Sequence, residues 1–443
     1  MTAKCVRCCG IFFLAVLITL GGSRAGASGF ALVEQSGKGL GESFAGGPTD
    51  TEDPSSLFYN PAASAFSAQN ALGLSFSAID ISVKYKDSGS TDVIGQPLTG
   101  GDGGDGGTVG LVPNLYYVQQ VADGVVFGFT VNAPFGLATK YPKDWKGRYH
   151  GVESDLAVIG ISPSAALQII PDVLSLGAAL NVQYADAKLT NAIDFGTILM
   201  AGAGTTPQTL DGFADLTGDD WALGYSLGLL YNPTPTTRLG LSYRSKVDHK
   251  LSGNVKFDVP LMARGILNAA GMSDFFVNTG GRARVTLPEI ITAGVYQELG
   301  DDFAVMASVA WTKWSRFKEL VVKFDSAQPD SPTEENWEDT LAYRLGVNYF
   351  IDERWTLRAG TAYDEGAVKS AYRTPRIPDN DRVWVSLGAG YQVNDDLRVD
   401  LSYAHLFIRD GKSELTNKPE AGFLVGEYES SINIFALEGV FTF

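Results

Sequence analysis

Residues 383–393 read Val-Trp-Val-Ser-Leu-Gly-Ala-Gly-Tyr-Gln-Val, and every second side chain from Val383 to Val393 is apolar or aromatic. Apart from Trp384, the side chains between them are small or polar. A period of two with one apolar face is typical of a strand that meets oil on one side and water on the other. Similar alternation recurs in fourteen segments from about residue 70 to Phe443. In a bilayer such strands must close into a barrel, because an open edge would leave backbone groups unpaired in hydrocarbon.

The connections between these segments alternate between short and long. Short, turn-like connections lie at 121–124, 170–172, 232–237, 300–302, 351–354 and 394–396. Long connections lie at roughly 86–110, 134–150, 187–219, 250–283, 322–340, 365–381 and 409–429. Short periplasmic turns and long outer loops are typical of outer-membrane barrels. The sequence therefore predicts an all-β, 14-stranded antiparallel transmembrane barrel in the bacterial outer membrane.

The first 27 residues have the features of a secretory signal peptide. The apolar run Ile11–Leu20 follows Lys4 and Arg7, and small residues follow it at 25–27. The run is about half of the ~20 residues that a spanning helix needs, although a retained helical anchor is the alternative. Cys5, Cys8 and Cys9 all lie in this leader, so neither disulfides nor thiolate metal sites are expected in the mature chain.

The formal net charge is −16. Nucleic-acid binding is not expected, because contact with phosphates needs a basic surface. No cofactor or metal is expected, and a monomer surrounded by outer-membrane lipids is predicted. The last strand ends on Phe443, which suits recognition by the barrel insertion machinery.

Residues 28–69 do not alternate and are rich in Gly, Ala and Ser. A fourteen-stranded barrel encloses a space that needs filling. We therefore expect 28–69 to form a hatch, or plug, inside a barrel made by 70–443; the alternative is a segment that dangles in the periplasm.

Short motifs along the whole chain resemble those of the FadL family of outer-membrane long-chain fatty acid transporters. The motifs are Ser28-Gly29-Phe30-Ala31-Leu32, Asn60-Pro61-Ala62, Val112-Pro113-Asn114, Tyr243-Arg244-Ser245, Trp311-Thr312-Lys313-Trp314-Ser315 and Ile377-Pro378-Asp379-Asn380-Asp381-Arg382. The resemblance implies diffusion-driven uptake of hydrophobic molecules without a cofactor. It also implies a hatch that contains Phe30, Leu32, Asn60, Pro61 and Ala62. Cargo would first meet an apolar groove between two outer loops, then reach a pocket beside the hatch, and leave through a gap at a kink in the third strand.

The third strand reaches Asn132, Pro134, Phe135 and Gly136. Proline removes a ladder donor and glycine relaxes the backbone, so pairing should break here. From the residues alone, Pro134 merely ends the strand; with the resemblance, these residues form a lateral gate.

Two long loops carry apolar clusters, which mark binding sites when they are exposed. We predict that they form the capture groove, with Phe195, Ile198, Leu199, Met200, Leu261, Met262, Ile266, Leu267, Phe275 and Phe276 as its residues. The alternative is that the two loops pack on each other as a lid.

A fatty-acid carboxylate in a dry lumen would need a basic partner. The candidates are Lys188, Arg244, Lys246, Arg284, Arg344 and Arg358. An arginine that fatty-acid members carry just beyond the fifth strand is missing here, where the chain reads Leu189-Thr190-Asn191. This departure favours neutral aromatic hydrocarbons as the alternative cargo.

Two other functions are set against transport of hydrophobic compounds. A polar porin conflicts with a plugged lumen. A lipid hydrolase is suggested by Gly224-Tyr225-Ser226-Leu227-Gly228, but this match lies within an alternating strand rather than at a strand-to-helix turn. His150, His249 and His405 are scattered and are expected at the surface, so no catalytic residues are predicted.

Overall fold

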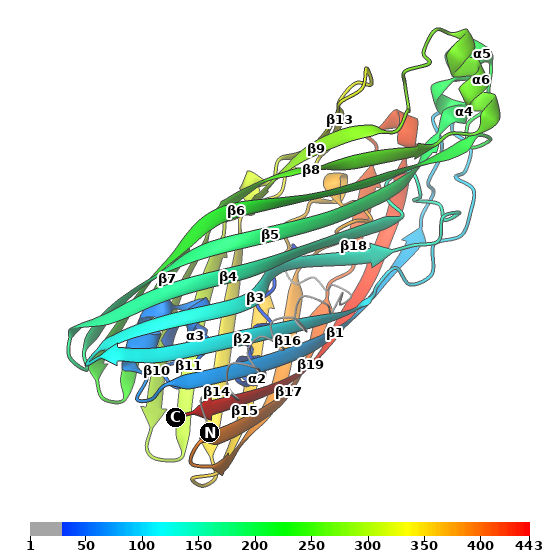
Figure 1. Ribbon diagram of the computed structural model, residues 1–443. Coiled ribbons are helices and arrows are strands. Elements are labelled where there is room, and N and C mark those ends of the chain that lie inside the picture. Colours follow the sequence, from blue (N-terminus) through cyan, green and yellow to red (C-terminus); the bar gives the residue numbers. More distant parts are fainter. Residues whose placement is uncertain (1–28) are drawn as a thin grey trace.

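The structure is a computed structural model that describes residues 29–443 (Figure 1). The predicted signal peptide lies outside the described residues. Nineteen strand segments form a single sheet that closes on itself, because β1 pairs with both β2 and β19. The segments are β1 (Ala71–Asp87), β2 (Val109–Ala122), β3 (Val125–Lys140), β4 (Glu153–Ile170), β5 (Leu174–Asp194), β6 (Asp211–Thr234), β7 (Thr237–Arg244), β8 (Val247–Asp258), β9 (Thr279–Leu287), β10 (Ile290–Leu299), β11 (Phe303–Thr312), β12 (Glu319–Phe324), β13 (Ser331–Glu334), β14 (Thr340–Phe350), β15 (Trp355–Asp364), β16 (Arg382–Asn394), β17 (Leu397–Ile408), β18 (Gly411–Leu415) and β19 (Leu424–Thr442).

The segments combine into fourteen wall strands. Short breaks divide four of these strands, into β7 and β8, β9 and β10, β11 and β12, and β17 and β18, while β13 belongs to a loop. All the pairings are antiparallel. The prediction of a closed 14-stranded antiparallel barrel is therefore confirmed.

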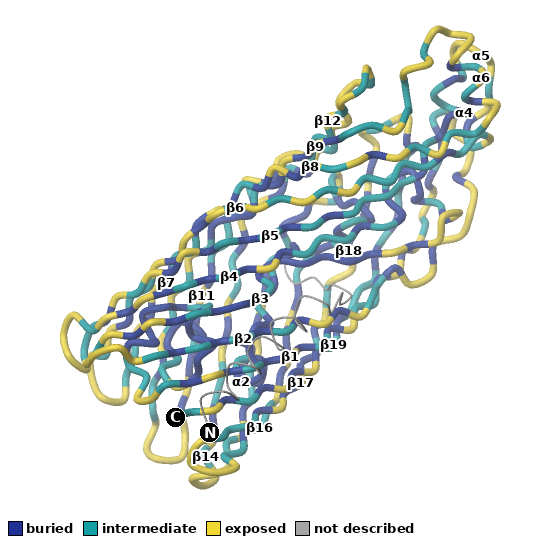
Figure 2. Tube along the Cα trace, viewed as in Figure 1, coloured by how far each residue is buried: buried dark blue, intermediate teal, exposed yellow. Residues whose placement is uncertain are grey.

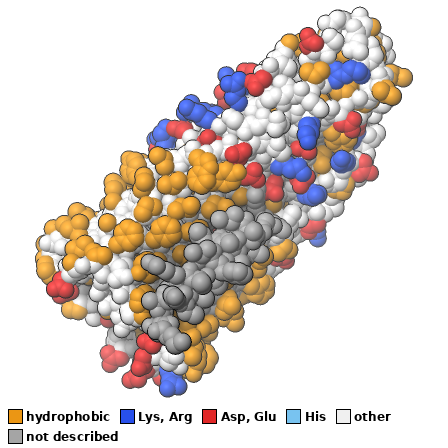
Figure 3. All heavy atoms as spheres, viewed as in Figure 1, with side chains coloured by type: hydrophobic (Ala, Val, Ile, Leu, Met, Phe, Trp, Pro, Cys, Tyr) orange, Lys and Arg blue, Asp and Glu red, His pale blue; other side chains and the backbone are white. Residues whose placement is uncertain are grey.

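The alternation along each strand divides the outer face from the inner face. In β16, Val383, Val385 and Leu387 are exposed, whereas Trp384 and Ser386 are buried. Side chains of this exposed kind gather into an apolar band over the lower part of the barrel in Figure 3. This band is the surface that a bilayer would cover.

The N-terminal segment, residues 29–66, lies against the inner side of the wall and is almost entirely buried (Figure 2). Its short helices are α2 (Gly37–Gly41), η1 (Gly47–Thr49), α3 (Ser56–Tyr59) and η2 (Pro61–Phe66). Whether the segment moves as a hatch remains a prediction.

The Asn-Pro-Ala motif fixes one end of this segment to the wall. The Asn60 amide donates to the carbonyls of Pro48 at 2.7 Å and Leu229 at 3.1 Å. The wall residues beside the motif are Gly177 and Gly228, where an added Cβ would lie 2.4 Å from Ala62 N and 2.0 Å from Asn60 Oδ1. Glycine is needed at both positions because the two backbones approach so closely.

The outer loops are shorter than the sequence predicted. The predicted loop 187–219 was too long, because β5 continues to Asp194 and β6 begins at Asp211. The predicted loop 250–283 was too long as well, because β8 extends to Asp258 and β9 begins at Thr279. These connections carry α4 (Phe195–Ile198), α5 (Met200–Ala203) and α6 (Leu261–Ala269), and two other loops carry η4 (Ser370–Tyr372) and η5 (Pro419–Ala421). The short helix η3 (Trp314–Arg316) lies in the break between β11 and β12. Within residues 29–443, none of the helices has the length and apolar content needed to span a bilayer.

Candidate functional site

Strand β3 carries a bulge at Pro134. Asn132 pairs with Gly160 and Phe135 pairs with Val158, so Ala133 and Pro134 lie opposite Ile159 alone. A residue inserted in this way bends a strand and disrupts its ladder. On the other side of β3, pairing with β2 ends at Leu115 and Val131. The wall is thus interrupted between β2 and β3 next to the bulge.

The strand nevertheless continues beyond Pro134. Its residues pair with β4 as far as Lys140, so the interpretation that Pro134 ends the strand was wrong. The N-terminal segment takes up backbone groups that β2 leaves free: Gly136 N donates to Phe30 O and Leu32 N donates to Pro134 O, both at 2.9 Å. Asn132, Pro134, Phe135 and Gly136 therefore lie where the segment touches the wall.

A cavity of about 110 Å³, the inner cavity, lies beside this contact. Its lining is mainly apolar and aromatic and includes Leu32, Phe44, Phe58, Tyr59, Pro134, Phe135, Tyr243, Arg244, Trp314, Leu341, Arg344 and Asp364. Two of the predicted head-group cations, Arg244 and Arg344, thus lie at the same cavity.

The two arginines differ in their partners. Arg244 donates from Nη2 to Phe58 O at 2.8 Å and its guanidinium lies 4.0 Å from the centre of the Phe58 ring. Among residues 29–443, it forms no ion pair with a carboxylate. Arg344 lies 3.6 Å from Asp364 Oδ1 and is therefore already balanced.

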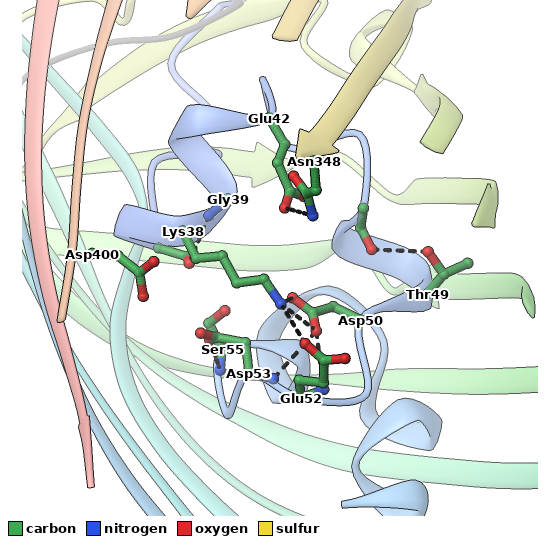
Figure 4. A network of polar contacts seen from close by, with 12 residues as sticks. Lys38, Gly39, Glu42, Thr49, Asp50, Glu52, Asp53, Ser55, Asn348 and Asp400 are labelled. Carbon is green, nitrogen blue, oxygen red and sulfur yellow. Dashed lines mark hydrogen bonds and ion pairs between the residues drawn. The ribbon is translucent and has the colours of Figure 1, made fainter. Parts of the chain in front are cut away.

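Arg358 has a structural role instead. It donates to Asp400 Oδ1 at 2.6 Å and lies 3.6 Å from Glu42 Oε1 of the N-terminal segment. Glu42 also accepts from Asn348 at 2.9 Å, and Lys38 pairs with Asp50 at 2.8 Å (Figure 4). The contacts of Glu42 with the wall help to hold the segment there, and two carboxylates already balance the charge of Arg358.

Three predicted cations do not face the lumen. Lys188 lies between Ala187 and Leu189, and Arg284 lies between Ala283 and Val285, and all four of these neighbours line a lumenal pocket. Alternation therefore turns both cations outward. Lys188 pairs with Glu153 at 2.8 Å, Arg284 pairs with Asp248 at 3.3 Å, and the exposed Lys246 pairs with Asp248 at 2.8 Å. These three candidates therefore do not lie where they could meet a head group in the lumen.

A second, almost wholly apolar space, the upper pocket, has a volume of about 60 Å³. Phe30, Leu137, Leu156, Leu216, Leu251 and Phe317 are among its lining residues. Between it and the inner cavity lies a cluster of aromatic rings, in which Phe30 is 4.9 Å from Trp314 and 5.7 Å from Trp337, centre to centre. Phe135 and Phe317 complete this aromatic cluster.

Three charged residues that were not among the predicted candidates line the upper pocket: Arg282, Arg376 and Glu335. Arg376 donates to Ser154 Oγ at 2.9 Å, and burial lowers its pKa to about 10. Burial raises the pKa of Glu335 to about 7, although its carboxylate accepts from Trp337 Nε1 at 3.0 Å. The only sequence signal for Arg376 was its position directly before the Ile-Pro-Asp motif.

The two apolar loops that we predicted to form the capture groove do contact each other, but much of their apolar surface is buried. Phe195 and Leu267 are fully buried and Leu199 is nearly so, in a cluster that also contains Ile198, Ile266 and Phe276. Leu261 and Met262 remain exposed. The loops therefore pack on each other as a lid, and only its rim offers apolar surface to solvent.

The hydrolase motif lies within β6, where Ser226 Oγ accepts from Asn181 Nδ2 at 2.8 Å. No helix or turn follows the serine, so it lacks the geometry of a nucleophile elbow. His249 is 3.2 Å from Asp220 and is buried, so the expectation of a surface histidine was wrong there.

Within the described chain, one group of carboxylates is close enough to suggest a metal site. Oxygens of Asp53, Asp400 and Glu438 lie within 4.8 Å of one another. Arg398 forms ion pairs with both aspartates, and Glu438 accepts from Ser36 Oγ and Lys38 N at 2.8 Å. Because arginines pair with both aspartates and the N-terminal segment donates to Glu438, the group is better described as part of the link between that segment and the wall.

Comparison with known proteins agrees with this architecture. Residues 18–443 match the family described as outer membrane protein transport protein (OMPP1/FadL/TodX). The chain belongs to this family. A long-chain fatty acid transport protein of Escherichia coli O6:H1 is 30% identical over 407 residues, which cover 88% of this chain and 90% of that protein.

Solved structures of relatives have the same fold. The crystal structure of a Pseudomonas aeruginosa FadL homologue has a TM-score of 0.88 and is 27% identical, covering 93% of this chain and 99% of that one. The Pseudomonas putida toluene transporter TodX has a TM-score of 0.70 at 20% identity, covering 93% of this chain and 99% of that one. The protein is thus an outer-membrane transport protein of the FadL family.

Proposed function

We propose that this FadL-family protein is a passive outer-membrane transporter of long-chain fatty acids or similar hydrophobic anions. The observation that carries the proposal is the position of Arg244, a guanidinium without a carboxylate partner among the described residues, on a largely apolar internal cavity. An anionic head group would supply the missing charge, while the acyl chain would fill the apolar lining.

The proposed route uses features that lie one after another in the barrel. Cargo is captured at the rim of the loop lid, near Leu261 and Met262, and enters the upper pocket. It passes the aromatic cluster, which includes Phe30 of the N-terminal segment, and reaches the inner cavity. Pro134 and Phe135 line that cavity, and Pro134 belongs to the bulge, which supports lateral release between β2 and β3.

The magnitudes agree with a transporter that needs no energy source. Each buried methylene contributes about 0.8 kcal/mol, so an acyl chain of about fifteen carbons gains roughly 12 kcal/mol before costs. Association costs several kcal/mol, which leaves micromolar binding. Such affinity is strong enough for capture and weak enough for release.

Neutral aromatic hydrocarbons are the second candidate cargo. The aromatic cluster between the two cavities favours them, because its rings would contact a flat apolar ligand without any polar partner. In this case Arg244 would serve only to hold Phe58.

Two further functions have less support. A polar porin has less support because the N-terminal segment is buried and is bonded to wall residues such as Glu438 and Leu229. A hydrolase conflicts with the strand position of Ser226. The monomeric state and the recognition of Phe443 by the insertion machinery remain predictions.

Mass spectrometry of small molecules extracted from the purified protein would test the cargo. We expect long-chain fatty acids from the wild type and markedly less from an Arg244→Met variant. Exclusively neutral aromatic compounds, present equally in both preparations, would overturn the anionic cargo and favour the second candidate.

A further inference from the structure

A basic groove of about 520 Å³ opens on the outer surface of the barrel, where β8, β9 and β12 run. Its charged lining consists of one carboxylate, Glu319, and the cations Lys250, Arg282, Arg284, Arg316, Lys318 and Lys323. The chain as a whole is acidic, with a net charge of −16, so a cluster of six cations at one place is unusual for its composition.

The groove arises from a second interruption of the wall. Strands β9 and β12 pair only between Gly281–Ala283 and Val322–Phe324, and pairing of β10 with β11 begins at Ile290 and Thr312. No ladder joins residues 284–289 to residues 313–321. Here η3 turns Trp314 and Phe317 into the interior, where both are buried, and leaves a recess outside.

Cations face one another across the strands of the groove. Lys250 is the direct partner of Arg284, and Arg282 is the direct partner of Lys323. Side chains in such positions lie about 5 Å apart at Cβ, and like charges there are destabilising. A bound anion would relieve both repulsions at once.

Carboxylates pair with four of the six cations of the groove. Arg284 pairs with Asp248 at 3.3 Å and Lys323 pairs with Asp330 at 3.8 Å, while Arg282 pairs with Asp325 and Arg316 with the buried Glu289. Apart from Glu289 and the partly buried Asp248, these partners are exposed, and exposed pairs contribute little. Among residues 29–443, the ammonium groups of Lys250 and Lys318 form no ion pair. Lys250 and Lys318 are therefore available to bind an anionic ligand.

The groove lies directly beyond the apolar band, on the side of the long loops. Leu239 and Leu241 are exposed on β7, and Ile291 and Val295 are exposed on β10, whereas the next segments of the same wall strands carry Lys250 and Arg284 outward. Figure 3 shows Lys and Arg side chains along the upper edge of the barrel past the band. This is the level of lipid head groups in the outer leaflet.

We propose that the groove binds the phosphate groups of the phosphorylated glycolipid of the outer leaflet, lipopolysaccharide. Several cations in one recess call for a ligand with several negative charges, which a single fatty-acid carboxylate does not supply. The acyl chains of the lipid would lie below, against the apolar band. The cations project from the outer wall, but Leu251, Ala283 and Phe317 line both the groove and the upper pocket, so the site adjoins the route proposed for cargo.

Titration of the purified protein in detergent with bis-phosphorylated lipopolysaccharide, followed by native mass spectrometry, tests the proposal. The test variant combines Lys250→Glu, Arg284→Glu and Lys318→Glu. A matched control combines Lys86→Glu, Lys369→Glu and Arg409→Glu, which makes the same charge change at exposed cations elsewhere. We expect the affinity to fall at least about tenfold in the test variant only.

Two measurements on the wild type make the test independent of how the variant folds. Dephosphorylated lipopolysaccharide should bind at least about tenfold more weakly, and affinity for the phosphorylated lipid should fall as salt rises. Equal binding of both lipids, or no salt dependence, would overturn the proposal. So would an unchanged test variant, an equal loss in the control, or displacement of the lipid by millimolar inorganic phosphate, which would indicate a site for the free ion.

Discussion

At the scale of single residues, Arg244 and Arg358 show how a cation that could bind cargo differs from one with a structural role. Its guanidinium touches the Phe58 ring and carbonyl but forms no ion pair within the described chain, whereas Arg358 is held between Asp400 and Glu42. A partly buried cation without a counter-charge is unfavourable, and an anionic ligand would offset that cost.

Replacing Arg244 should therefore discriminate between cargo types. In Arg244→Met we expect the dissociation constant for a long-chain fatty acid to rise about tenfold, because one charge-assisted contact is lost. Affinity for the matching fatty alcohol should stay the same. Isothermal titration in detergent would measure both, with the outward-facing Lys188→Met as control. Equal losses for acid and alcohol would show that Arg244 only shapes the cavity.

Glu335 gives a second prediction, on the pH dependence of stability. Its pKa is raised from 4.5 to about 7 by burial, so between these values the folded protein binds more protons than the unfolded chain. The contribution of Glu335 to stability therefore falls as pH rises from about 4.5 to about 7.

Thermal unfolding of Glu335→Gln in detergent, from pH 4.5 to 8, would measure this contribution. The variant should match the wild type near pH 4.5 and exceed its midpoint temperature above pH 7, since an amide does not ionise. Midpoints that differ by the same amount at every pH would contradict this account of Glu335.

At the scale of secondary-structure elements, the β3 bulge depends on one extra residue. Ala133 and Pro134 together oppose Ile159, so deleting Pro134 would leave one residue opposite one and restore a regular ladder with β4. We expect this deletion to abolish uptake of labelled cargo by cells while binding in detergent persists. Pro134→Ala, which keeps the extra residue, should retain uptake. Full uptake by the deletion variant would place the exit elsewhere.

Two leucines on helix α6 of the loop lid, one buried and one exposed, allow packing of the lid to be tested separately from cargo capture. Leu267 is fully buried among Phe195 and its neighbours, whereas Leu261 on the same α6 is 92% exposed. Leu267→Ala should destabilise the lid by about 2–5 kcal/mol, as buried leucines do, and should be visible as faster hydrogen exchange in α6. Leu261→Asp should leave exchange unchanged but slow cargo capture. If neither change altered capture, the lid would have no part in uptake.

Particular residues show what the sequence could and could not predict. Alternation at residues 383–393 predicted the wall, because contact with lipid imposes a period of two on every strand. It did not predict which way Lys188 or Arg284 faces, since a shift of one residue moves a side chain to the other face. The position of Arg376 could not be predicted either, because it depends on a contact with Ser154, which lies 222 residues away in the chain.

At the scale of the whole molecule, the barrel combines an N-terminal segment packed inside the wall with an interruption of that wall. The N-terminal segment is held to the wall by buried ion pairs and by close contacts at Gly177 and Gly228. Apolar cavities and a bulged strand lie beside the same segment. This combination suits cargo that partitions into protein and lipid rather than water.

Transfer across proteoliposomes that contain the purified protein tests this account most directly. The membranes would be supplied with a labelled long-chain fatty acid on one side, while swelling in sugar solutions is followed in parallel. The account predicts accelerated transfer of the fatty acid without an energy source and no swelling above protein-free liposomes. Rapid swelling in sugars, with fatty-acid transfer no faster than in protein-free liposomes, would contradict it.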